Sequence, residues 1–412
     1  MNPAALYRPK NVLILVENLP VPFDRRVWQE ACALRAAGYA VAVICPTGVG
    51  CEQSHEVLEG VHIHRYRPAP EGARLIGYAR EYAVALVKTA VLAWRVAFTR
   101  GVDIVHACNP PDLFFLIGAP FKLLGKKFIF DHHDLGPELY EAKYGRRGFI
   151  YRVMLALEYA TFRLADVVLA TNESYRQIAM SRGRVPAGQV FVVRSGPSLE
   201  RMRSLPPDDR LRCGRRFLVG YVGVMGKQEG IDSLLNSVRH IVHDRKRTDI
   251  HFALVGGGTS LEDMQALATR LNVERYVTFT GRAPDDVLLR VLSTADVCVN
   301  PDTANEMNDK STMNKIMEYM AVGKPIVQFD LKEGRYSAQQ AALYARCGDA
   351  IDFAEQIVAL LDDPERRKRM GEFGYERVVK ELEWRHQIRH LLAAYESLWP
   401  QRTEVRHETL AP

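Results

Sequence analysis

The chain has 412 residues, 47% of them hydrophobic and 25% charged, which is typical of a soluble enzyme with two or three domains and excludes a disordered or fibrous protein. The net charge is uneven: residues 1–199 hold 24 basic against 17 acidic side chains, a net +7, while residues 200–412 carry a net −1. The basic first half favours an anionic partner, or is an ordinary surface imbalance. Seven scattered cysteines without a C-x-x-C pair indicate reduced thiols in a cytoplasmic protein.

Short apolar strands alternate with amphipathic helices along the whole first half, a pattern that predicts a parallel α/β domain. A helix over 25–38 ends at a glycine. The predicted strands are 11–16, 40–45, 61–66, 103–107, 127–131, 166–170 and 189–193. Residues 194–216 then interrupt the alternation with Pro, Gly, Ser and charges, which predicts a linker.

The alternation resumes in the second half, and three helical patterns close the chain. The predicted strands are 217–222, 251–256, 276–281, 296–300 and 325–330, and the closing helices are 350–362, 364–381 and 384–399. We expect two doubly wound domains facing each other across a cleft, with ligand sites at the carboxyl ends of their strands. Their expected bounds are 1–195, a linker at 196–216, 217–383, and a last segment, 384–412, whose helix crosses back to the first domain.

The segment 75–100 is the nearest to a membrane helix, but Arg80, Glu81, Lys88 and Arg95 interrupt its apolar run. One interpretation is an ordinary helix with one buried face. The other is a helix that lies on a membrane surface, because aromatic residues stand beside basic ones.

Two arginines follow the first strand, where Asp24 is a candidate N-cap and Arg25 and Arg26 fill the first helical turn. Cations are unfavourable at a helix N-terminus unless an anion is bound there. Arg25 and Arg26 therefore either bind an anionic acceptor or lie on a solvated face of the helix.

Four ionisable residues, Asp131 to Asp134, follow the strand at 127–131. Adjacent residues after a strand point in opposite directions, so one metal ion would collect two ligands at most. The same residues could cap the helix that Pro137 opens. Alternatively, one histidine faces the cleft as a base or hydrogen-bond donor, as the strand-end position favours.

Three loops of the second half are candidates for phosphate binding. Residues 220–235 and 254–264 are glycine-rich strand-to-helix turns, and neither matches an ATP-binding P-loop or a dinucleotide fingerprint. The third is a helix start at 310–315, with Ser311 or Thr312 as N-cap and lysines at 310 and 315 in place of the usual acids. Together they predict a nucleoside-diphosphate site.

These residues resemble a known family. "HDLGPE" (133–138), "MEYMAVGKPIV" (317–327) and the tandem α/β halves are similar to the GT-B retaining glycosyltransferases of family 4, and 20–46 is similar to bacterial members that build O-antigen or exopolysaccharide. The resemblance implies catalytic roles for His133, facing the anomeric carbon, and Glu318, gripping the ribose. It implies donor phosphates on backbone N–H groups between Ser311 and Asn314, and the base near Gly281 and Arg282.

The sequence departs from the family pattern at three positions. Lys310 stands where the first acid of a Glu-x7-Glu motif is expected, and Val224 and Glu229 replace an Arg and a Lys of the glycine-rich loop. We hypothesise that Lys227, Lys310 and Lys315 supply the missing charge. The expected donor residues are Gly223, Lys227, Gly281, Arg282, Lys310, Ser311, Thr312, Met313, Asn314, Lys315 and Glu318, and the expected acceptor residues are Asp24, Arg25, Arg26 and Asp134.

The expected activity is metal-independent transfer, with retention, from a UDP- or GDP-sugar to a polyprenyl-diphosphate-linked saccharide in cell-surface polysaccharide synthesis. The expected location is the cytoplasmic face of the plasma membrane, with an anionic surface contacted by the first domain. A nucleotide-sugar epimerase of the same fold and a non-catalytic sugar-nucleotide binder remain alternatives. Nucleic-acid binding is disfavoured, because no strand interleaves aromatic and basic residues.

Overall fold

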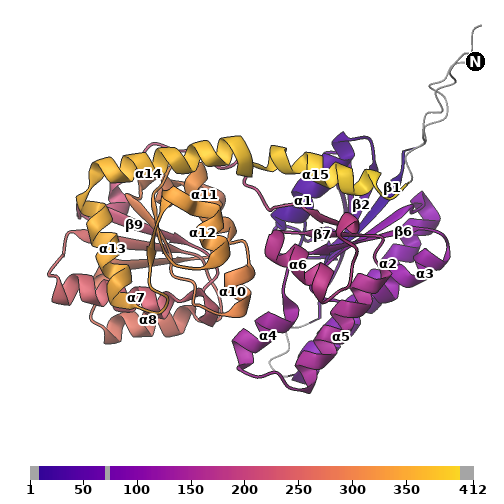
Figure 1. Ribbon diagram of the computed structural model, residues 1–412, viewed down its shortest axis with the longest axis horizontal. Helices are drawn as coiled ribbons and strands as arrows, with labels where there is room; N and C mark the ends of the chain where they lie inside the picture. The colour runs from indigo at the N-terminus through magenta and orange to yellow at the C-terminus, as the bar shows by residue number, and fades with distance from the viewer. Residues whose placement is uncertain (1–8, 70–74, 400–412) are drawn as a thin grey trace, which may run out of the picture. The chain divides into compact units, whose positions relative to one another are not determined.

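The computed structural model describes residues 9–69 and 75–399 (Figure 1). Its chain contacts divide them into two compact units. The N-terminal unit comprises the described residues up to Asp134, Val153–Val193, and the residues from Ile388 onward. The C-terminal unit comprises Leu135–Arg152 and Arg194–Gln387.

The N-terminal unit is built on an eight-stranded sheet of order β3-β4-β2-β1-β5-β6-β7-β8, in which only β3 runs antiparallel to its neighbour. Its central strands are buried over nearly their full length, because helices cover both faces of a parallel sheet. The strands are β1 Asn11–Leu15, β2 Ala40–Pro46, β3 His55–Leu58, β4 Val61–Tyr66, β5 Ile104–Cys108, β6 Lys127–His132, β7 Val167–Ala170 and β8 Val190–Val192. The helices are α1 Arg25–Ala36, α2 Leu75–Arg100, α3 Phe115–Leu123, α5 Phe149–Leu164, α6 Glu173–Ser181 and α15 Trp384–Glu396, of which α5 and α15 cross the unit boundary.

The C-terminal unit has a six-stranded, wholly parallel sheet of order β11-β10-β9-β12-β13-β14. Its strands are β9 Phe217–Val222, β10 Ile250–Val255, β11 Val277–Gly281, β12 Val297–Asn300, β13 Ile326–Phe329 and β14 Ala342–Ala345. Its helices are α7 Ile231–Arg239, α8 Leu261–Arg270, α9 Asp285–Thr294, α10 Glu306–Lys310, α11 Asn314–Ala321, α12 Lys332–Ala338, α13 Ala350–Asp362 and α14 Pro364–Arg377; α4 Gly136–Tyr144 is grouped with this unit.

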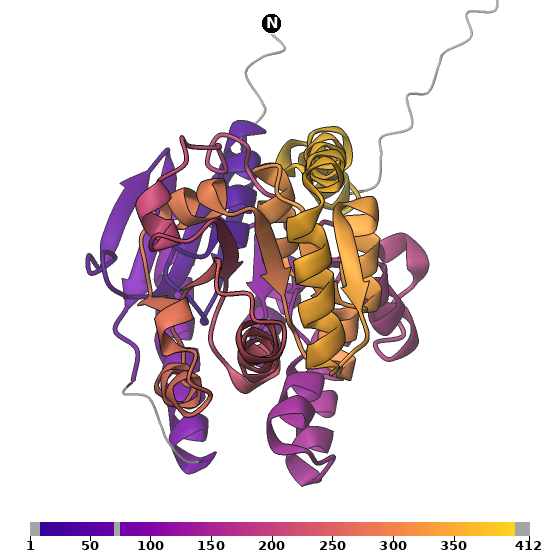
Figure 2. The same cartoon turned by 90° about the vertical axis from the view of Figure 1, so that its left-hand side faces the viewer.

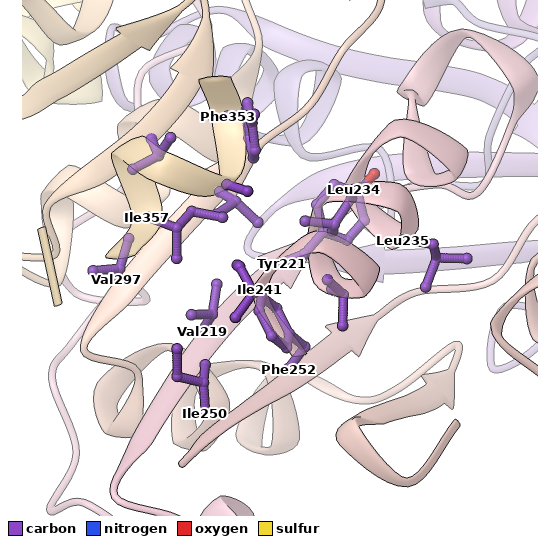
Figure 3. Close-up of a cluster of buried hydrophobic side chains, with 14 of the residues drawn as sticks. Val219, Tyr221, Leu234, Leu235, Ile241, Ile250, Phe252, Val297, Phe353 and Ile357 are labelled. Carbon is purple, nitrogen blue, oxygen red and sulfur yellow. The ribbon is translucent and has the colours of Figure 1, made fainter. Parts of the chain in front are cut away.

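The core of the C-terminal unit lies on both faces of this sheet, with helices on either side (Figure 2). Successive residues of β9 point to opposite faces. Val219 and Tyr221 pack with Phe252 and Phe353 on one face (Figure 3), and Leu218 packs on the other. This two-sided burial explains why the strands appear in the sequence as continuous apolar runs.

Each sheet has one point where the strand order reverses, and these points place the candidate sites. In the N-terminal unit, β1 lies between β2 and β5; in the C-terminal unit, β9 lies between β10 and β12. Ligands of doubly wound sheets bind outside the carboxyl ends of the strands at such a point.

Every strand predicted from the sequence is present, with ends within one residue of those expected. Two strands were missed. β3, with the sequence HEVL, is an edge strand with polar and exposed positions, and β14, with the sequence ALYA, is too short and small-sided to stand out from the helices around it.

The predicted linker at 196–216 is instead an ordered strap on the C-terminal unit. Met202 is fully buried, and the Leu205 N–H donates to Ser293 Oγ at 2.8 Å. Gly196 passes so close to Leu382 that a Cβ there would lie 2.2 Å from the Leu382 carbonyl oxygen. The polar composition of this segment therefore indicates a surface path along one unit.

Within α2, Arg80–Arg100 is long and apolar enough to cross a membrane by length and composition alone. A core helix of a soluble protein would pass the same test, but only 22% of its apolar window is buried. Ala85, Ala93 and Val96 pack inward, while Val91 and Phe98 are exposed. Its membrane role stays a prediction.

Candidate active site

In the N-terminal unit, three side chains form a hydrogen-bonded chain at the carboxyl end of β6. Arg26 donates to both carboxylate oxygens of Asp131, from Nε at 2.8 Å and from Nη2 at 2.6 Å. The Nδ1 of His133 lies 2.9 Å from Asp131 Oδ2. Asn109 Oδ1 accepts the backbone N–H of His133 at 2.9 Å, which fixes the turn after the strand. His133 is thus held in one orientation by groups that are themselves buried.

These contacts set the charge of His133. Burial alone would lower its pKa, but the Asp131 carboxylate outweighs that effect and raises the pKa to about 9. Burial would likewise raise the pKa of Asp131, but Arg26 and His133 hold it well below its usual range. At neutral pH His133 is therefore protonated, so it acts as a hydrogen-bond donor and not as a base.

Arg26 lies in the first turn of α1, as predicted, but its side chain is buried and not on a solvated face of the helix. It is buried, 8% exposed, and its guanidinium contacts Asp131, Glu30 at 3.1 Å and the Val193 carbonyl at 2.9 Å. A solvated helix face is excluded for it, and its geometry is that of a residue that positions Asp131. Asp24 is the N-cap of α1 and accepts from the Val27 N–H, as predicted.

Arg25 is half-buried in the first turn of α1, and Asp134 donates its backbone N–H to Asn109 Oδ1 at 3.1 Å. Burial raises the pKa of both Asp24 and Asp134. Their contact with an acceptor stays a prediction.

The other ionisable groups near β6 point elsewhere. His132 turns to the opposite side from His133 and contacts Glu158 at 3.2 Å. Among the residues described here, His106, Cys108 and Asp131 form the one group with metal-ligand atoms within 4.8 Å of each other. Because Asp131 is already bonded to a guanidinium, a cation there would face a resident positive charge, so this group does not fit a metal.

Cys108 does not fit a nucleophile. Burial and the nearby Asp131 and Glu30 carboxylates raise its pKa well above the usual range, which keeps the thiol protonated.

In the C-terminal unit, the two predicted glycine-rich phosphate loops pack against each other. The Gly223 N–H donates to the Val255 carbonyl at 3.0 Å, and the Met225 N–H to the Gly257 carbonyl at 2.9 Å. Gly256 has a φ of +140°, and a Cβ there would lie 1.8 Å from the Gly223 carbonyl oxygen. Those two N–H groups are therefore used within the protein and are not available to a phosphate, and phosphate binding by the rest of the loop stays a prediction.

The helix start at 310–315 also differs from the prediction. Two helices meet there: α10 ends at Lys310, and α11 begins at Asn314 with Met313 as its N-cap. The Ser311 N–H donates to the Met307 carbonyl at 2.9 Å, so it caps α10 and is not available to a phosphate. Thr312 and the N-cap Met313 lie directly ahead of α11, and Asn314 is its first residue.

Lys310 has an explanation within the chain. It lies in the last turn of α10, where a cation is favourable, and pairs with Glu306 at 3.4 Å. Its unusual charge therefore does not by itself imply a bound anion.

Lys315 is buried between two acids. Its Nζ lies 2.7 Å from Glu229 Oε2 and 2.8 Å from Asp302 Oδ1, and 5.0 Å from the centre of the Tyr221 ring. Burial raises the pKa of Asp302 to about 7, against the opposing effect of Lys315. The hypothesis that Lys315 supplies charge to the donor is wrong in its simple form, because Glu229 and Asp302 already neutralise it.

The predicted ribose acid, Glu318, lies in the second turn of α11 and is 13% exposed at its side chain. Arg201, from the strap, donates to it at 3.0 Å and also binds both oxygens of Asp285. Asp285 begins α9, shortly after Gly281 and Arg282. The residues predicted for the ribose and the base are therefore brought to one end of the sheet, with Lys227 exposed in the glycine-rich loop.

Sequence reasoning missed two arginines of this region, Arg194 and Arg201. Arg194 lies two residues after the last strand of the N-terminal sheet, and its Nη1 contacts Thr312 Oγ1 at 3.4 Å. The strand-end rule that indicated residues 131–134 could have found it, but the apparent linker composition concealed it.

Comparisons with known families agree with this organisation. The family described as Glycosyltransferase Family 4 matches residues 24–201, and the family described as Glycosyl transferases group 1 matches residues 216–363. The chain belongs to the family 4 glycosyltransferases and has the GT-B fold.

Its relatives are distant. The D-inositol 3-phosphate glycosyltransferase of Corynebacterium jeikeium is 26% identical over 195 residues, 45% of each chain. The 2-deoxystreptamine glucosyltransferase of Streptomyces kanamyceticus is 22% identical over 71% of this chain and 77% of its own. The chain thus spans about half the length of the first relative and three quarters of the second.

Solved structures match over nearly the whole chain. Sucrose-phosphate synthase from Thermosynechococcus elongatus has a TM-score of 0.78 at 20% identity, covering 94% of this chain and 99% of its own. HepE of Anabaena, solved with UDP-glucose, has a TM-score of 0.72 at 16% identity, covering 94% and 99%. At these identities the likeness shows the fold alone.

Proposed function

We propose that this glycosyltransferase transfers a sugar, with retention and without a metal, from a nucleoside-diphosphate sugar to a lipid-linked saccharide in cell-surface polysaccharide synthesis. The observation that carries the proposal is the position of His133 at a strand end, with its Nδ1 2.9 Å from Asp131, whose carboxylate is held in turn by Arg26. The family matches and a solved neighbour bound to UDP-glucose support a sugar-nucleotide donor.

A positively charged hydrogen-bond donor such as His133 suits the chemistry of a retaining transfer. A retaining transfer without a nucleophile must stabilise a developing oxocarbenium ion and the departing diphosphate. His133 would use its second ring nitrogen to donate a hydrogen bond to a sugar hydroxyl, while Asp131, bonded to Nδ1, keeps the ring oriented. Glu318 would bind the ribose hydroxyls, and this contact would partly replace its hydrogen bond with Arg201.

A panel of UDP, GDP and ADP in thermal unfolding tests the donor site, because a ligand that binds the native state raises the melting temperature. We expect one nucleotide to stabilise the protein and the other two to do so less. Stabilisation by none of the three would contradict a nucleoside-diphosphate donor. Incubation of the wild-type enzyme with donor alone then separates transfer from epimerisation, which would yield an isomeric sugar nucleotide without acceptor.

A lipid-linked acceptor is supported by the exposed apolar residues of α2 and α3. Val91 and Phe98 on α2 and Leu123 on α3 are between 63% and 90% exposed, and Arg95 lies beside them on α2. Together they match a surface that inserts shallowly among anionic lipids. In liposome flotation at low salt, the wild type should rise with anionic vesicles and Phe98→Glu should not; Val49→Glu, a similarly exposed apolar residue on the β2–β3 loop, is the matched control. Wild-type protein that stays at the bottom with anionic vesicles would contradict membrane docking.

A further inference from the structure

Arg194 is a buried cation at the start of α11. It is 7% exposed, its Nη2 lies 3.5 Å from Glu333 Oε2, and its Nη1 lies 3.4 Å from Thr312 Oγ1. The guanidinium also lies 4.3 Å from the centre of the Tyr336 ring. Glu333 and Tyr336 thus fix the position of a positive charge one residue ahead of the N-cap of α11.

Two other cations of this region are more closely engaged by acids. Lys315 has two carboxylates within 2.8 Å, and Arg201 binds Asp285 at 2.7 Å and Glu318 at 3.0 Å. By contrast, both polar contacts of the Arg194 guanidinium are at the long limit of a hydrogen bond, where such bonds are weak. Because a guanidinium carries five N–H donors, most of its donor capacity remains for a closer anion.

We infer that Arg194 binds the diphosphate of the donor at the start of α11, an assignment that rests on the proposed function. The planar fork of a guanidinium matches two oxygens of a phosphate, and burial strengthens the interaction. Phosphate oxygens bound at Thr312–Asn314 would lie beside Arg194. Their hydrogen bonds to its guanidinium would replace its long contact with Glu333.

This assignment accounts for the altered glycine-rich loop. Val224 and Glu229 stand where the family pattern that the sequence resembles has an Arg and a Lys, and Lys315 is paired with Glu229 and Asp302. Arg194, two residues ahead of the strap, restores positive charge at the start of α11.

The test measures affinity for UDP, UMP and uridine by calorimetry, or for the guanosine series if GDP is the stabilising nucleotide. The variants are Arg194→Gln and Arg194→Lys. Arg377→Lys is the matched control, because Arg377 contacts the same Tyr336 ring, at 5.7 Å, and donates to the Ser337 carbonyl. Unchanged melting curves of the ligand-free variants show that each is folded.

Arg194→Gln should weaken UDP binding at least tenfold and leave uridine binding within twofold, with Arg194→Lys intermediate and Arg377→Lys unchanged. If Arg194→Gln fails to fold, the comparison of UDP with uridine in Arg194→Lys decides. Equal losses for uridine and UDP, or no loss for UDP, would overturn the role of Arg194 while the donor site stands. Wild-type protein that binds none of the nucleoside diphosphates would overturn the proposed function and this inference together.

Discussion

Each unit has a buried cation held between two acids: Arg26 lies between Asp131 and Glu30 in the N-terminal unit, and Lys315 lies between Glu229 and Asp302 in the C-terminal unit. Both clusters lie at the reversal point of a doubly wound sheet. They differ in the side chain that completes each cluster. Asp131 also bonds to His133, whose side chain is 13% exposed, whereas the second cluster is closed by Tyr221, fully buried.

The comparison teaches that one charge pattern can serve two purposes. The planar guanidinium of Arg26 fixes both oxygens of Asp131 and so fixes the ring of His133, which suits a reactive group. The Lys315 ammonium, a compact point charge, ties the glycine-rich loop to α11, which suits a structural tie. Four experiments would break or sharpen this difference.

The largest effect is expected for Arg26→Met, because it leaves Asp131 and Glu30 as uncompensated buried carboxylates. Removing one partner of a buried ion pair costs about 3–5 kcal/mol, so the N-terminal unit should unfold at markedly lower denaturant. Arg26→Lys should recover only part, since an ammonium cannot bind both oxygens in the same plane. A variant as stable as wild type would refute the role of Arg26 as the residue that holds Asp131.

His133→Phe should lower turnover by on the order of 100-fold with little change in donor affinity, as expected for loss of one positioned donor. The measurement is kcat beside nucleotide affinity. His132→Phe, next in sequence but facing Glu158, tests whether the loss depends on direction. Equal losses of turnover in both variants would contradict a specific role for His133.

Lys315→Met should cost less than Arg26→Met, on the order of 2 kcal/mol, because Asp302, with its raised pKa, can accept a proton when the cation is lost. Adding Glu229→Gln to Lys315→Met should recover part of that stability. If the two substitutions were instead strictly additive in chemical denaturation, Lys315 and Glu229 would not be coupled.

The smallest effect is the pH dependence of stability. The pKa of His133 is raised from 6.5 to about 9, so the folded state binds this proton more tightly than the unfolded state. Its contribution is complete below about pH 6.5 and is lost as the pH rises through 9, with about 2 kcal/mol of it lost between pH 7 and pH 9. Wild type should therefore lose stability relative to His133→Gln between pH 7 and 9, and parallel profiles would contradict the pairing with Asp131.

The strand positions were predictable because each buried strand is a continuous apolar run. The strand-end rule indicated one of the two histidines after β6, and the family resemblance selected His133. The orientation of the Arg26 side chain was not predictable from the sequence. Its partner Asp131 is 105 residues away, and no local pattern links the two residues. The start of α11 was misplaced because the five-residue α10 leaves no periodicity to read, so the sequence pattern assigns Lys310 to the wrong helix.

The hydrogen bond between Tyr395 and His106 has a consequence for biosynthesis. The two side chains are fully buried and 2.7 Å apart, but 289 positions separate them in the chain. As the chain leaves the ribosome, the eight-stranded sheet is finished long before α15 exists to cover His106. Until the C-terminal unit has been made, His106 therefore lacks its Tyr395 partner, and a Tyr395→Phe chain would complete that core without this hydrogen bond.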